Sequence, residues 1–483
     1  MRYIFFLCYL CVALVVEQEF NTVAAIKETP QENISEKTSA FVTVSYADGK
    51  ISADYKLGKS VSSFPFFAKE NPYFASSWQI QSDVLLITNN MVKSIDGRDF
   101  DRFTILISPE PEDTSNSWSL AKIGDEGVVL QTGYLLGNKE IFETTICILD
   151  RPSVCDAIPD MPPAFDHKMS GVIDPVTASR GSAVYFGVQD YENHYDYRFL
   201  FDSATPEWLA NSLREELKYS LKFHENTLYW TFDTPISIFT HFDGEHDINQ
   251  WRADATDGGA YVFRFRGDGF TPKNDFVQRT VAKYIYLNQN NRIALNWFNQ
   301  KDVMENPWFY VGSIGYWTDS MMQKRFDLEQ KQTDRDFQTN MRACLENKAQ
   351  IAALAEENKE PVPVAQECGY VFMWLVDTLI KTKSEQQSDM FSVWQSLLGV
   401  KVREGGLRQR FLRQILDIDE DSTLAGFFYS LNKPTLEYVN ALRLSLVSVG
   451  REDLANRYFP EVSDTTTTAK ILNIFENVVN DRN

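Results

Sequence analysis

The chain has 483 residues, of which 43% are hydrophobic and 13% aromatic, and its formal net charge is -20. The apolar content is too high for a disordered chain, and the length corresponds to about two to four domains. The negative charge argues against nucleic-acid binding, because phosphates need a compensating cationic surface.

The N-terminus reads as a secretory signal peptide. "MRYIFFLCYLCVALVV" begins with a basic residue and continues as an apolar run of roughly 14 residues, which is short for a membrane span. We assign residues 1–25 to a signal peptide and leader and residues 26–40 to a flexible leader; an N-terminal membrane anchor is the alternative. No later segment is apolar enough to span a bilayer, so we expect a soluble mature chain without a transmembrane segment, periplasmic or secreted.

The next part of the chain predicts β-structure. "FVTVSYADGKISADYKL" indicates two strands joined by a turn at Asp48 and Gly49. Further strand-like runs follow as far as "YRFLF", and no convincing helix interrupts them. Residues 41–200 are therefore expected to form an all-β, sandwich-like N-terminal domain.

The pattern changes at Thr205 and Pro206, where a threonine cap and a proline at the first helical position predict a helix. Two strands, "PISIFTHF" and "GGAYVFRFRG", come next, and "NDFVQRTVAKYIYLNQ" predicts a helix over 276–289. Residues 201–460 are expected to form a second, mainly helical domain, and 461–483 a polar tail. Later helices are predicted at 315–330, 336–357, 369–382, 388–398, 404–416 and 435–448.

Four of the six cysteines lie outside the signal segment, in two local pairs. An exported chain meets an oxidising compartment, so the spacing suggests the disulfides Cys147–Cys155 and Cys344–Cys368. Free buried thiols are the alternative, because four cysteines allow three pairings.

The order of these elements resembles the glycyl aminopeptidase family of gluzincin zinc metallopeptidases, relatives of aminopeptidase N and thermolysin. In that family one helix carries His-Glu-x-x-His, and a later segment reads roughly Trp-Phe-x-Glu-Gly-x-x-x-Tyr. Residues 308–316 match the later segment with Val311 in place of the glutamate. "ECGYVFMWLVDTLIKTKS" also resembles a family helix, with Gly369 and Asp377 in register. The resemblance implies an α+β, two-domain fold with a thermolysin-like second domain.

The zinc motif itself is replaced. In the frame "VAKYIYLNQ", Lys283, Tyr284 and Leu287 stand where the family has its first histidine, glutamate and second histidine. A lysine puts a cation where a metal ion must bind, and a tyrosine with a pKa of about 10 cannot act as a carboxylate base. We therefore expect no catalytic residues, no metal and no cofactor, and a protein that is not an enzyme.

The resemblance implies a catalytically inactive homologue that binds a peptide or protein in the former active-site cleft. In the family, the strand that here contains Tyr261 often holds a glutamate for the amino end of the substrate. An apolar and aromatic cleft favours docking of side chains over hydrolysis. Its expected lining residues are Tyr261, Tyr284, Leu287, Trp308, Val311 and Tyr316.

Three alternatives remain open. The stretch "HFDGEHD" places His241 and His246 among Asp243, Glu245 and Asp247, which could hold a metal in an exported metallohydrolase with a relocated site; a solvated acidic turn is the simpler interpretation. The chain could also be a structural cell-envelope protein that binds through its β-domain. Finally, the helix over 276–289 could belong to an unrelated exported protein and match the peptidase frame by chance.

Overall fold

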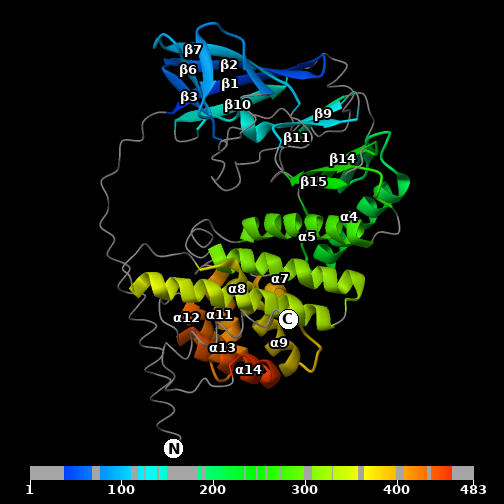
Figure 1. Ribbon diagram of the computed structural model, residues 1–483, viewed down its shortest axis with the longest axis vertical. Coiled ribbons are helices and arrows are strands. Elements are labelled where there is room, and N and C mark those ends of the chain that lie inside the picture. Colours follow the sequence, from blue (N-terminus) through cyan, green and yellow to red (C-terminus); the bar gives the residue numbers. More distant parts are fainter. Residues whose placement is uncertain are drawn as a thin grey trace, which may run out of the picture.

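The computed structural model describes residues 37–67, 77–109, 118–124, 127–138, 141–148, 183–187, 191–232, 235–245, 249–255, 259–271, 275–297, 307–328, 330–356, 364–398, 407–431 and 437–459. The predicted signal peptide and tail lie outside the described residues, as do residues 26–36 of the predicted leader, Cys155 and His246. The end of the predicted flexible leader is wrong, because β1 already begins at Thr38 and Ala40 is buried in the N-terminal core. The fold is α+β, as predicted: β-sheets form the N-terminal region and helices the C-terminal part. Figure 1 shows the sheets at one end of the molecule and the helices at the other.

The N-terminal region is built on a five-stranded sheet with the order β10-β1-β2-β7-β4. The predicted hairpin is confirmed, because β1 and β2 pair antiparallel and both turn residues, Asp48 and Gly49, have positive φ angles (52° and 74°). Such angles suit the turn that matches the twist of two-residue hairpins. The strands are β1 (Thr38–Ala47), β2 (Lys50–Val61), β4 (Trp78–Ile80), β7 (Phe100–Ile107) and β10 (Phe142–Ile148).

Two three-stranded sheets complete this region, with the orders β3-β6-β5 and β11-β9-β8. On β9, Val128 and Leu130 face the N-terminal core, whereas Val129 faces the opposite side and joins a second cluster. The sheet β11-β9-β8 therefore packs on both faces. The bounds are β3 (Ser63–Pro65), β5 (Leu85–Thr88), β6 (Met91–Ser94), β8 (Leu120–Ile123), β9 (Gly127–Gln131), the 3-10 helix η1 (Thr132–Leu135) and β11 (Ala183–Phe186).

A second five-stranded sheet, with the order β12-β13-β14-β16-β15, joins the two parts of the molecule. Its alternating side chains have two partners: Phe263 faces the helical core, and Val262 packs with Val129 of β9. Strand β13 contains the predicted run "YRFLF" and pairs parallel with β14 of this second sheet. The strands are β12 (Glu192–Asn193), β13 (Tyr197–Phe201), β14 (Ile236–Asp243), β15 (Gln250–Ala255) and β16 (Ala260–Arg266).

The first long helix, α4 (Glu207–Leu228), begins one residue later than predicted. Pro206 occupies the cap position with an extended backbone (φ -63°, ψ 142°) and makes no side-chain cap. Thr205 is not the cap either, because its hydroxyl donates to the carboxylate of Asp202. Helix α5 (Asp275–Trp297) extends eight residues beyond the predicted end at 289.

The remaining helices lie below α5 in Figure 1 and share one core with α4, α5 and the second sheet. Helix α7 starts at Pro307 rather than at the predicted 315, because Trp308 and Phe309 are buried core residues of its first turn. Helices α12 and α14 were not predicted. The bounds are α7 (Pro307–Phe326), α8 (Gln330–Glu356), α9 (Gln366–Lys383), α10 (Met390–Leu398), α11 (Leu407–Ile418), α12 (Thr423–Leu431), α13 (Glu437–Ser448) and α14 (Glu452–Tyr458).

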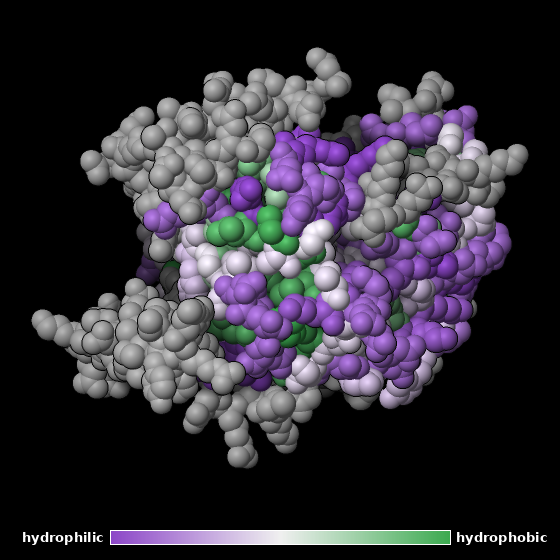
Figure 2. Space-filling view, turned by 90° about the horizontal axis from the view of Figure 1, so that it is seen from below, coloured by the Kyte–Doolittle hydropathy of each residue, from purple (hydrophilic) through white to green (hydrophobic). Residues whose placement is uncertain are grey.

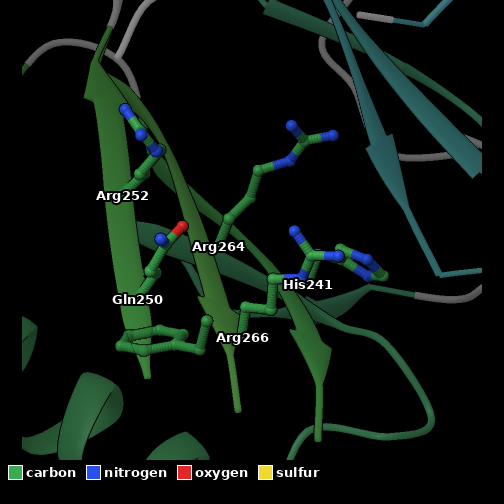
Figure 3. A pocket seen from close by; sticks show the side chains of 6 residues that line it. His241, Gln250, Arg252, Arg264 and Arg266 are labelled. Atoms are coloured by element: carbon green, nitrogen blue, oxygen red, sulfur yellow. The ribbon is translucent and has the colours of Figure 1, made fainter. Parts of the chain in front are cut away.

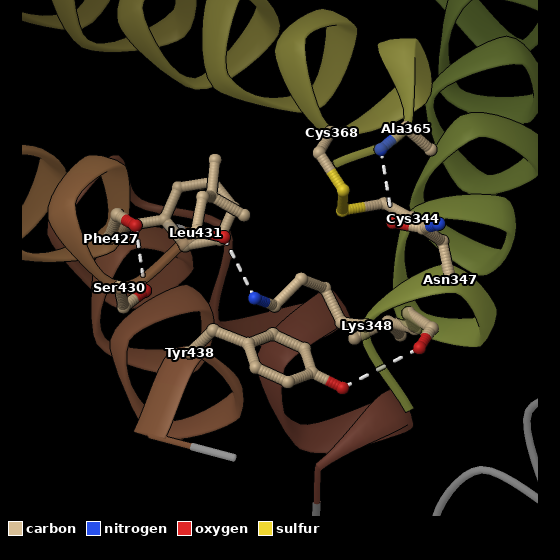
Figure 4. Close-up of a disulfide and its surroundings, with 10 residues drawn as sticks. Cys344, Asn347, Lys348, Ala365, Cys368, Phe427, Ser430, Leu431 and Tyr438 are labelled. Atoms are coloured by element: carbon tan, nitrogen blue, oxygen red, sulfur yellow. Dashed lines mark hydrogen bonds between the residues drawn. A yellow bond between two sulfur atoms is a disulfide. The ribbon is translucent and has the colours of Figure 1, made fainter. Parts of the chain in front are cut away.

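The predicted disulfide between Cys344 and Cys368 is confirmed. It joins α8 to α9 with the two Cα atoms 4.7 Å apart (Figure 4). The other predicted pair lies outside the described part of the chain, which includes only the backbone of Cys147. None of the helices described is long and apolar enough to cross a bilayer.

Figure 2 views the helical end of the molecule and shows apolar residues surrounded by hydrophilic ones. The C-terminal helices carry several exposed apolar side chains, namely Leu416, Tyr429, Leu444 and Val447. Leu444 of α13 is one of these, with 50% of its surface exposed to solvent.

Candidate functional site

The four positions that the sequence resemblance aligns with the zinc motif lie on the helix pair α5 and α7. Lys283 Nζ of α5 lies 3.0 Å from Asp319 Oδ1 of α7, and the Tyr310 hydroxyl of α7 donates to Asn291 Oδ1 of α5 over 2.6 Å. These two contacts show that the helices run antiparallel. They place Val311 beside the C-terminal half of α5 and Lys283 at the opposite end of the contact.

Lys283, which the resemblance aligns with the first zinc ligand, forms an ion pair with Asp319. Its side chain is 58% exposed and that of Asp319 is 23% exposed. A pair this open to water stabilises the fold by about 0–1 kcal/mol at most. Its effect is chemical rather than structural, because the carboxylate that could attract a metal ion already has an ammonium partner.

The next two positions of α5 form an apolar surface next to the second sheet. The Tyr284 ring is half-buried and meets Phe263 of β16 edge-on, with ring centroids 5.6 Å apart. It also lies 6.3 Å from the Trp251 ring of β15. Leu287, one turn further on, is 40% exposed, and Val311 is half-buried against the helical core.

The other predicted lining residues are core residues. Tyr261 is 1% exposed, and burial raises the pKa of its phenol well above the usual value. Trp308 is 3% exposed, with its ring centroid 5.1 Å from that of Phe428. Tyr316 is 5% exposed and donates its hydroxyl to Asp377. Of the six predicted lining residues, Tyr284, Leu287 and Val311 are therefore at least partly accessible to solvent. Tyr261, Trp308 and Tyr316 are buried.

Residues that carry the sequence resemblance meet at the crossing of α7 and α9. Gly312 faces Gly369 at backbone contact, and Tyr316, about one turn further along α7, donates its hydroxyl to Asp377, about two turns further along α9. These matches follow from the packing of two helices. They say nothing about chemistry.

The opposite face of α5 carries a buried polar network that the sequence did not reveal. Glu216 of α4 is fully buried and accepts hydrogen bonds from the Tyr286 hydroxyl (2.6 Å), Gln278 Nε2 (2.9 Å) and Arg325 Nη2 (2.9 Å). A buried carboxylate needs such partners, since an unpaired one would be costly. The network fixes α5 between α4 and α7.

His224 of α4 lies in the same layer and is fully buried. Its Nε2 lies 2.9 Å from Asn290 Oδ1 of α5. Burial lowers the pKa of the imidazole to about 4, so the ring is neutral at pH 7. A neutral histidine is a potential ligand, but its visible partner is an amide, and Asn290 in turn donates to Thr318 of α7 over 3.1 Å. These hydrogen bonds link α4, α5 and α7 and give His224 a structural role.

His241, the candidate for a relocated metal site, lies at the end of β14. Its Nδ1 is 2.8 Å from Asp202 Oδ2, and the side chain borders a small pocket with three arginines (Figure 3). His246 lies outside the described residues. The three guanidinium groups that line the same pocket would repel a divalent cation bound by His241. Among the residues described, no group of three His, Cys, Asp or Glu side chains could hold a metal ion.

Comparisons with known proteins give two results. No family model and no curated protein sequence matches the chain. Among solved structures, it is similar to an aminopeptidase N family protein from Idiomarina loihiensis, with a TM-score of 0.46, 10% identity and coverage of 75% of this chain and 70% of that one. It is also similar to native leukotriene A4 hydrolase from Saccharomyces cerevisiae, with a TM-score of 0.36, 10% identity and coverage of 94% and 85%. At these values no residue-level correspondence follows.

Proposed function

We propose that this chain is an exported, non-catalytic protein with a peptidase-like fold, which binds a peptide or protein on the surface formed by α5 and α7. The ion pair between Lys283 and Asp319 is the observation that carries the proposal. It sits where the sequence resemblance implies the first zinc ligand.

The chemistry of the substituted positions supports the absence of catalysis. Zinc needs neutral imidazoles or carboxylates as donors, and a peptidase needs a base for the metal-bound water. Lys283 is engaged in the ion pair with Asp319, Leu287 and Val311 have no lone pairs, and a phenol such as that of Tyr284 is a poor base at neutral pH. Loss of all four groups together removes both the metal and the base.

The exposed part of this helix pair suits binding. Leu287 offers an apolar side chain to solvent, next to the half-buried Tyr284 and Val311. The ion pair of Lys283 and Asp319 supplies charged groups at one end. A small apolar centre with polar groups at its edge is the usual composition of a protein-binding surface.

Export is supported by two independent features of the chain. The N-terminal segment has the basic start and short apolar run of a signal peptide. The disulfide between Cys344 and Cys368 is of a type that persists in oxidising compartments and is rare in reducing ones. We propose a periplasmic or secreted location.

The catalytic half of the proposal is tested by metal analysis and peptide hydrolysis assays on the mature protein, purified without chelators and without added metal. We expect no stoichiometric zinc and no chelator-sensitive cleavage of short peptides. Zinc at one equivalent together with such cleavage would overturn the proposal and favour the exported metallohydrolase.

The binding half is tested by selecting ligands from a displayed random-peptide library. Leu287→Asp should lose the selected peptides, because it places a charge in the apolar centre. Leu444→Asp is the matched control, since Leu444 is comparably exposed but lies on α13. Equal loss of binding in both variants, or no loss in either, would rule out the α5 and α7 surface and leave the β-region as the binding part.

A further inference from the structure

An open pocket of about 350 Å³ lies where α4, α9 and α10 meet. It is lined by the C-terminal end of α4, the last turn of α9, the loop that follows α9, and the first turns of α10. Its volume is at the lower end of the range for ligand pockets, which is about 300–1,000 Å³. Of the ten lining residues that the structure describes, seven are polar and uncharged.

Four of the uncharged lining residues carry a primary amide. Asn226 lies on α4, Gln386 and Gln387 lie in the loop after α9, and Gln395 lies on α10. None of these four side chains is hydrogen-bonded to another residue that the structure describes. Each amide offers two N–H donors and one carbonyl acceptor. The pocket therefore presents donors and acceptors together, from three separate segments of the chain.

The two charged lining residues are each paired with an opposite charge. Lys381 Nζ lies 2.6 Å from Asp377 Oδ2, and Lys324 Nζ lies 2.8 Å from Asp389 Oδ2. An anionic ligand would have to compete with Asp377 for Lys381. A cationic ligand would likewise have to compete with Lys324 for Asp389. We therefore expect a ligand without net charge.

The pocket offers little apolar surface. Phe391 is the one apolar side chain among the lining residues that the structure describes, and it is 3% exposed. Its ring packs edge-on against Phe223 of α4, with ring centroids 5.3 Å apart. An apolar ligand, or a peptide with apolar side chains, would find no complementary surface here. The lining instead suits a ligand rich in hydroxyl groups.

The loop that carries two of the amides has an unusual backbone. Glu385 and Gln386 have positive φ angles of 50° and 68°, which are unfavourable for residues with a Cβ atom. Local hydrogen bonds hold this conformation: the Gln386 N–H donates to the Lys381 carbonyl over 2.7 Å, and the Ser388 N–H donates to Ser384 Oγ over 3.0 Å. Such conformations cluster at binding sites, and a fixed loop loses less entropy when it binds.

We propose that this pocket binds a neutral mono- or disaccharide. Each sugar hydroxyl both donates and accepts a hydrogen bond, as the four unpaired amides of the lining do together. The site is separate from the surface on α5 and α7, because its residues lie on α4, α9, α10 and the loop after α9. This proposal and the proposed function can therefore fail independently.

The test is saturation-transfer NMR and titration of the full mature protein with maltose, cellobiose, lactose and chitobiose. Sorbitol is the control, because it carries hydroxyl groups on an open chain without a ring. We expect saturable binding of at least one disaccharide and none of sorbitol. The binding should be weak, since hydrogen bonds at an open pocket replace hydrogen bonds to water. Absence of saturable binding with all four sugars, or equal binding of sorbitol, would overturn the proposal.

Two amide variants locate the site. Gln386→Ala and Gln395→Ala should each weaken binding about threefold to tenfold, because each removes the hydrogen bonds of one amide. Gln79→Ala is the matched control, since Gln79 is exposed on β4 in the N-terminal region. It should leave binding unchanged. Unchanged binding in both pocket variants, or equal weakening by Gln79→Ala, contradicts the proposal.

A third variant blocks the pocket instead of removing a hydrogen bond. Ser392 lines the pocket and is exposed on α10, so Ser392→Trp adds a bulky ring that occupies the space of the ligand. Binding should be lost while the melting temperature stays close to that of the parent. A folded Ser392→Trp protein that binds the sugar as well as the parent would place the sugar elsewhere.

A peptide is the rival ligand, because amide side chains also bind a peptide backbone. N-acetyl-dialanine amide, which is uncharged, should bind no better than sorbitol. Saturable binding of this peptide in the parent and in Leu287→Asp, with loss in Gln386→Ala and no binding of any sugar, would assign the pocket to a peptide and refute the saccharide proposal.

Discussion

Gly312 of α7 and Gly369 of α9 are in contact where the two helices cross. A Cβ atom added at Gly312 would lie 2.5 Å from the Cα atom of Gly369, and one added at Gly369 would lie 3.1 Å from the Cα atom of Gly312. Both distances are shorter than the separation of carbon atoms in van der Waals contact. The crossing therefore depends on the absence of side chains at both positions.

Gly312→Ala should destabilise the protein, because a methyl group forces the two helices apart in a packed core. We expect a loss of about 1–3 kcal/mol in the free energy of unfolding, measured by urea denaturation. Gly426→Ala in α12 is the control, since a Cβ there meets nothing within 4 Å. That variant should be neutral or more stable by about 0.5–1 kcal/mol. Equal effects of the two changes would mean that the crossing tolerates a wider spacing.

The second prediction concerns the disulfide. The bond between Cys344 and Cys368 closes a loop with a sequence separation of 24 and links α8 to α9 (Figure 4). Its removal by Cys344→Ser and Cys368→Ser together should cost about 3–4 kcal/mol on the chain-entropy account. A reducing agent should lower the stability of the parent protein by more than that of the double variant, in which only the predicted bond between Cys147 and Cys155 can be reduced. A stable parent in reductant, with the bond shown to be open, would contradict this.

The third prediction uses a buried lysine near the disulfide. Lys348 of α8 is 1% exposed, donates from Nζ to the carbonyl oxygen of Leu431 over 2.7 Å, and lies 5.3 Å from the Tyr438 ring centroid. Burial lowers the pKa of its ammonium from 10.5 to about 8. Between these values the unfolded chain binds more protons than the folded one, so folding becomes more favourable as the pH rises from about 8 to 10.5.

This dependence is measured against Lys348→Met. Tyrosines with raised pKa values, including Tyr438, have the opposite effect above about pH 10, because their unfolded forms lose protons first. The difference in urea midpoint between parent and variant isolates the lysine. It should change in favour of the parent as the pH rises from 8 to 10, and a constant difference would show that Lys348 titrates normally.

The fourth prediction tests the ion pair between Arg325 of α7 and the buried Glu216 of α4. Arg325→Met would leave the fully buried Glu216 without its cationic partner. We expect a cost of about 3 kcal/mol, the lower end for buried pairs, since the Arg325 side chain is 27% exposed. Tyr286→Phe, which removes one hydrogen bond to the same carboxylate, should cost about 1.5–3 kcal/mol. Arg335→Met on the exposed face of α8 should stay within about 0.5 kcal/mol and serves as the control.

Local signals in the sequence were sufficient for part of the fold. The turn at Asp48 and Gly49 was predictable because an Asp-Gly pair readily adopts the two positive φ angles that this hairpin turn needs. The parallel pairing of β13 with β14 was not, since a helix of 22 residues separates the two strands and nothing in "YRFLF" indicates its partner. The long helix α5 was recognised, but its end was placed at 289, before the buried residues Ile293 and Ala294.

The candidate site likewise has features that the sequence predicts and features that only the structure shows. Positions 283, 284, 287 and 311 were singled out by the resemblance to the peptidase motifs, in which residues four apart on a helix share a face. The partner of Lys283 could not, since Asp319 lies on another helix. Burial of Tyr261 and Trp308 was likewise invisible, because aromatic residues serve cores and clefts equally well in a single sequence.

The last prediction concerns reconstruction of a zinc site on α5 and α7. Positions 283 and 287 share one face of α5, whereas the bond between Tyr310 and Asn291 places position 311 about two turns further along α5 than Lys283, so the variant tests whether the three positions can reach one ion. Histidines at the first two and a glutamate at the third would supply three protein ligands, with water as the fourth. The variant combines Lys283→His, Tyr284→Glu, Leu287→His and Val311→Glu. It should bind zinc in calorimetric titration, where the parent should not.

Two matched variants show which ligand matters. The triple variant that retains Val311 should bind zinc more weakly, because it lacks the carboxylate ligand. Val311→Glu alone should destabilise the fold by several kcal/mol, since it puts a carboxylate against the helical core without a cation. Zinc affinity in the fourfold variant should still fall about 10–100-fold short of a natural site, because the second layer of hydrogen bonds is missing. A folded fourfold variant that binds zinc no better than the parent would mean that these four positions do not converge, and the resemblance of "VAKYIYLNQ" to a metal-binding helix would then be accidental.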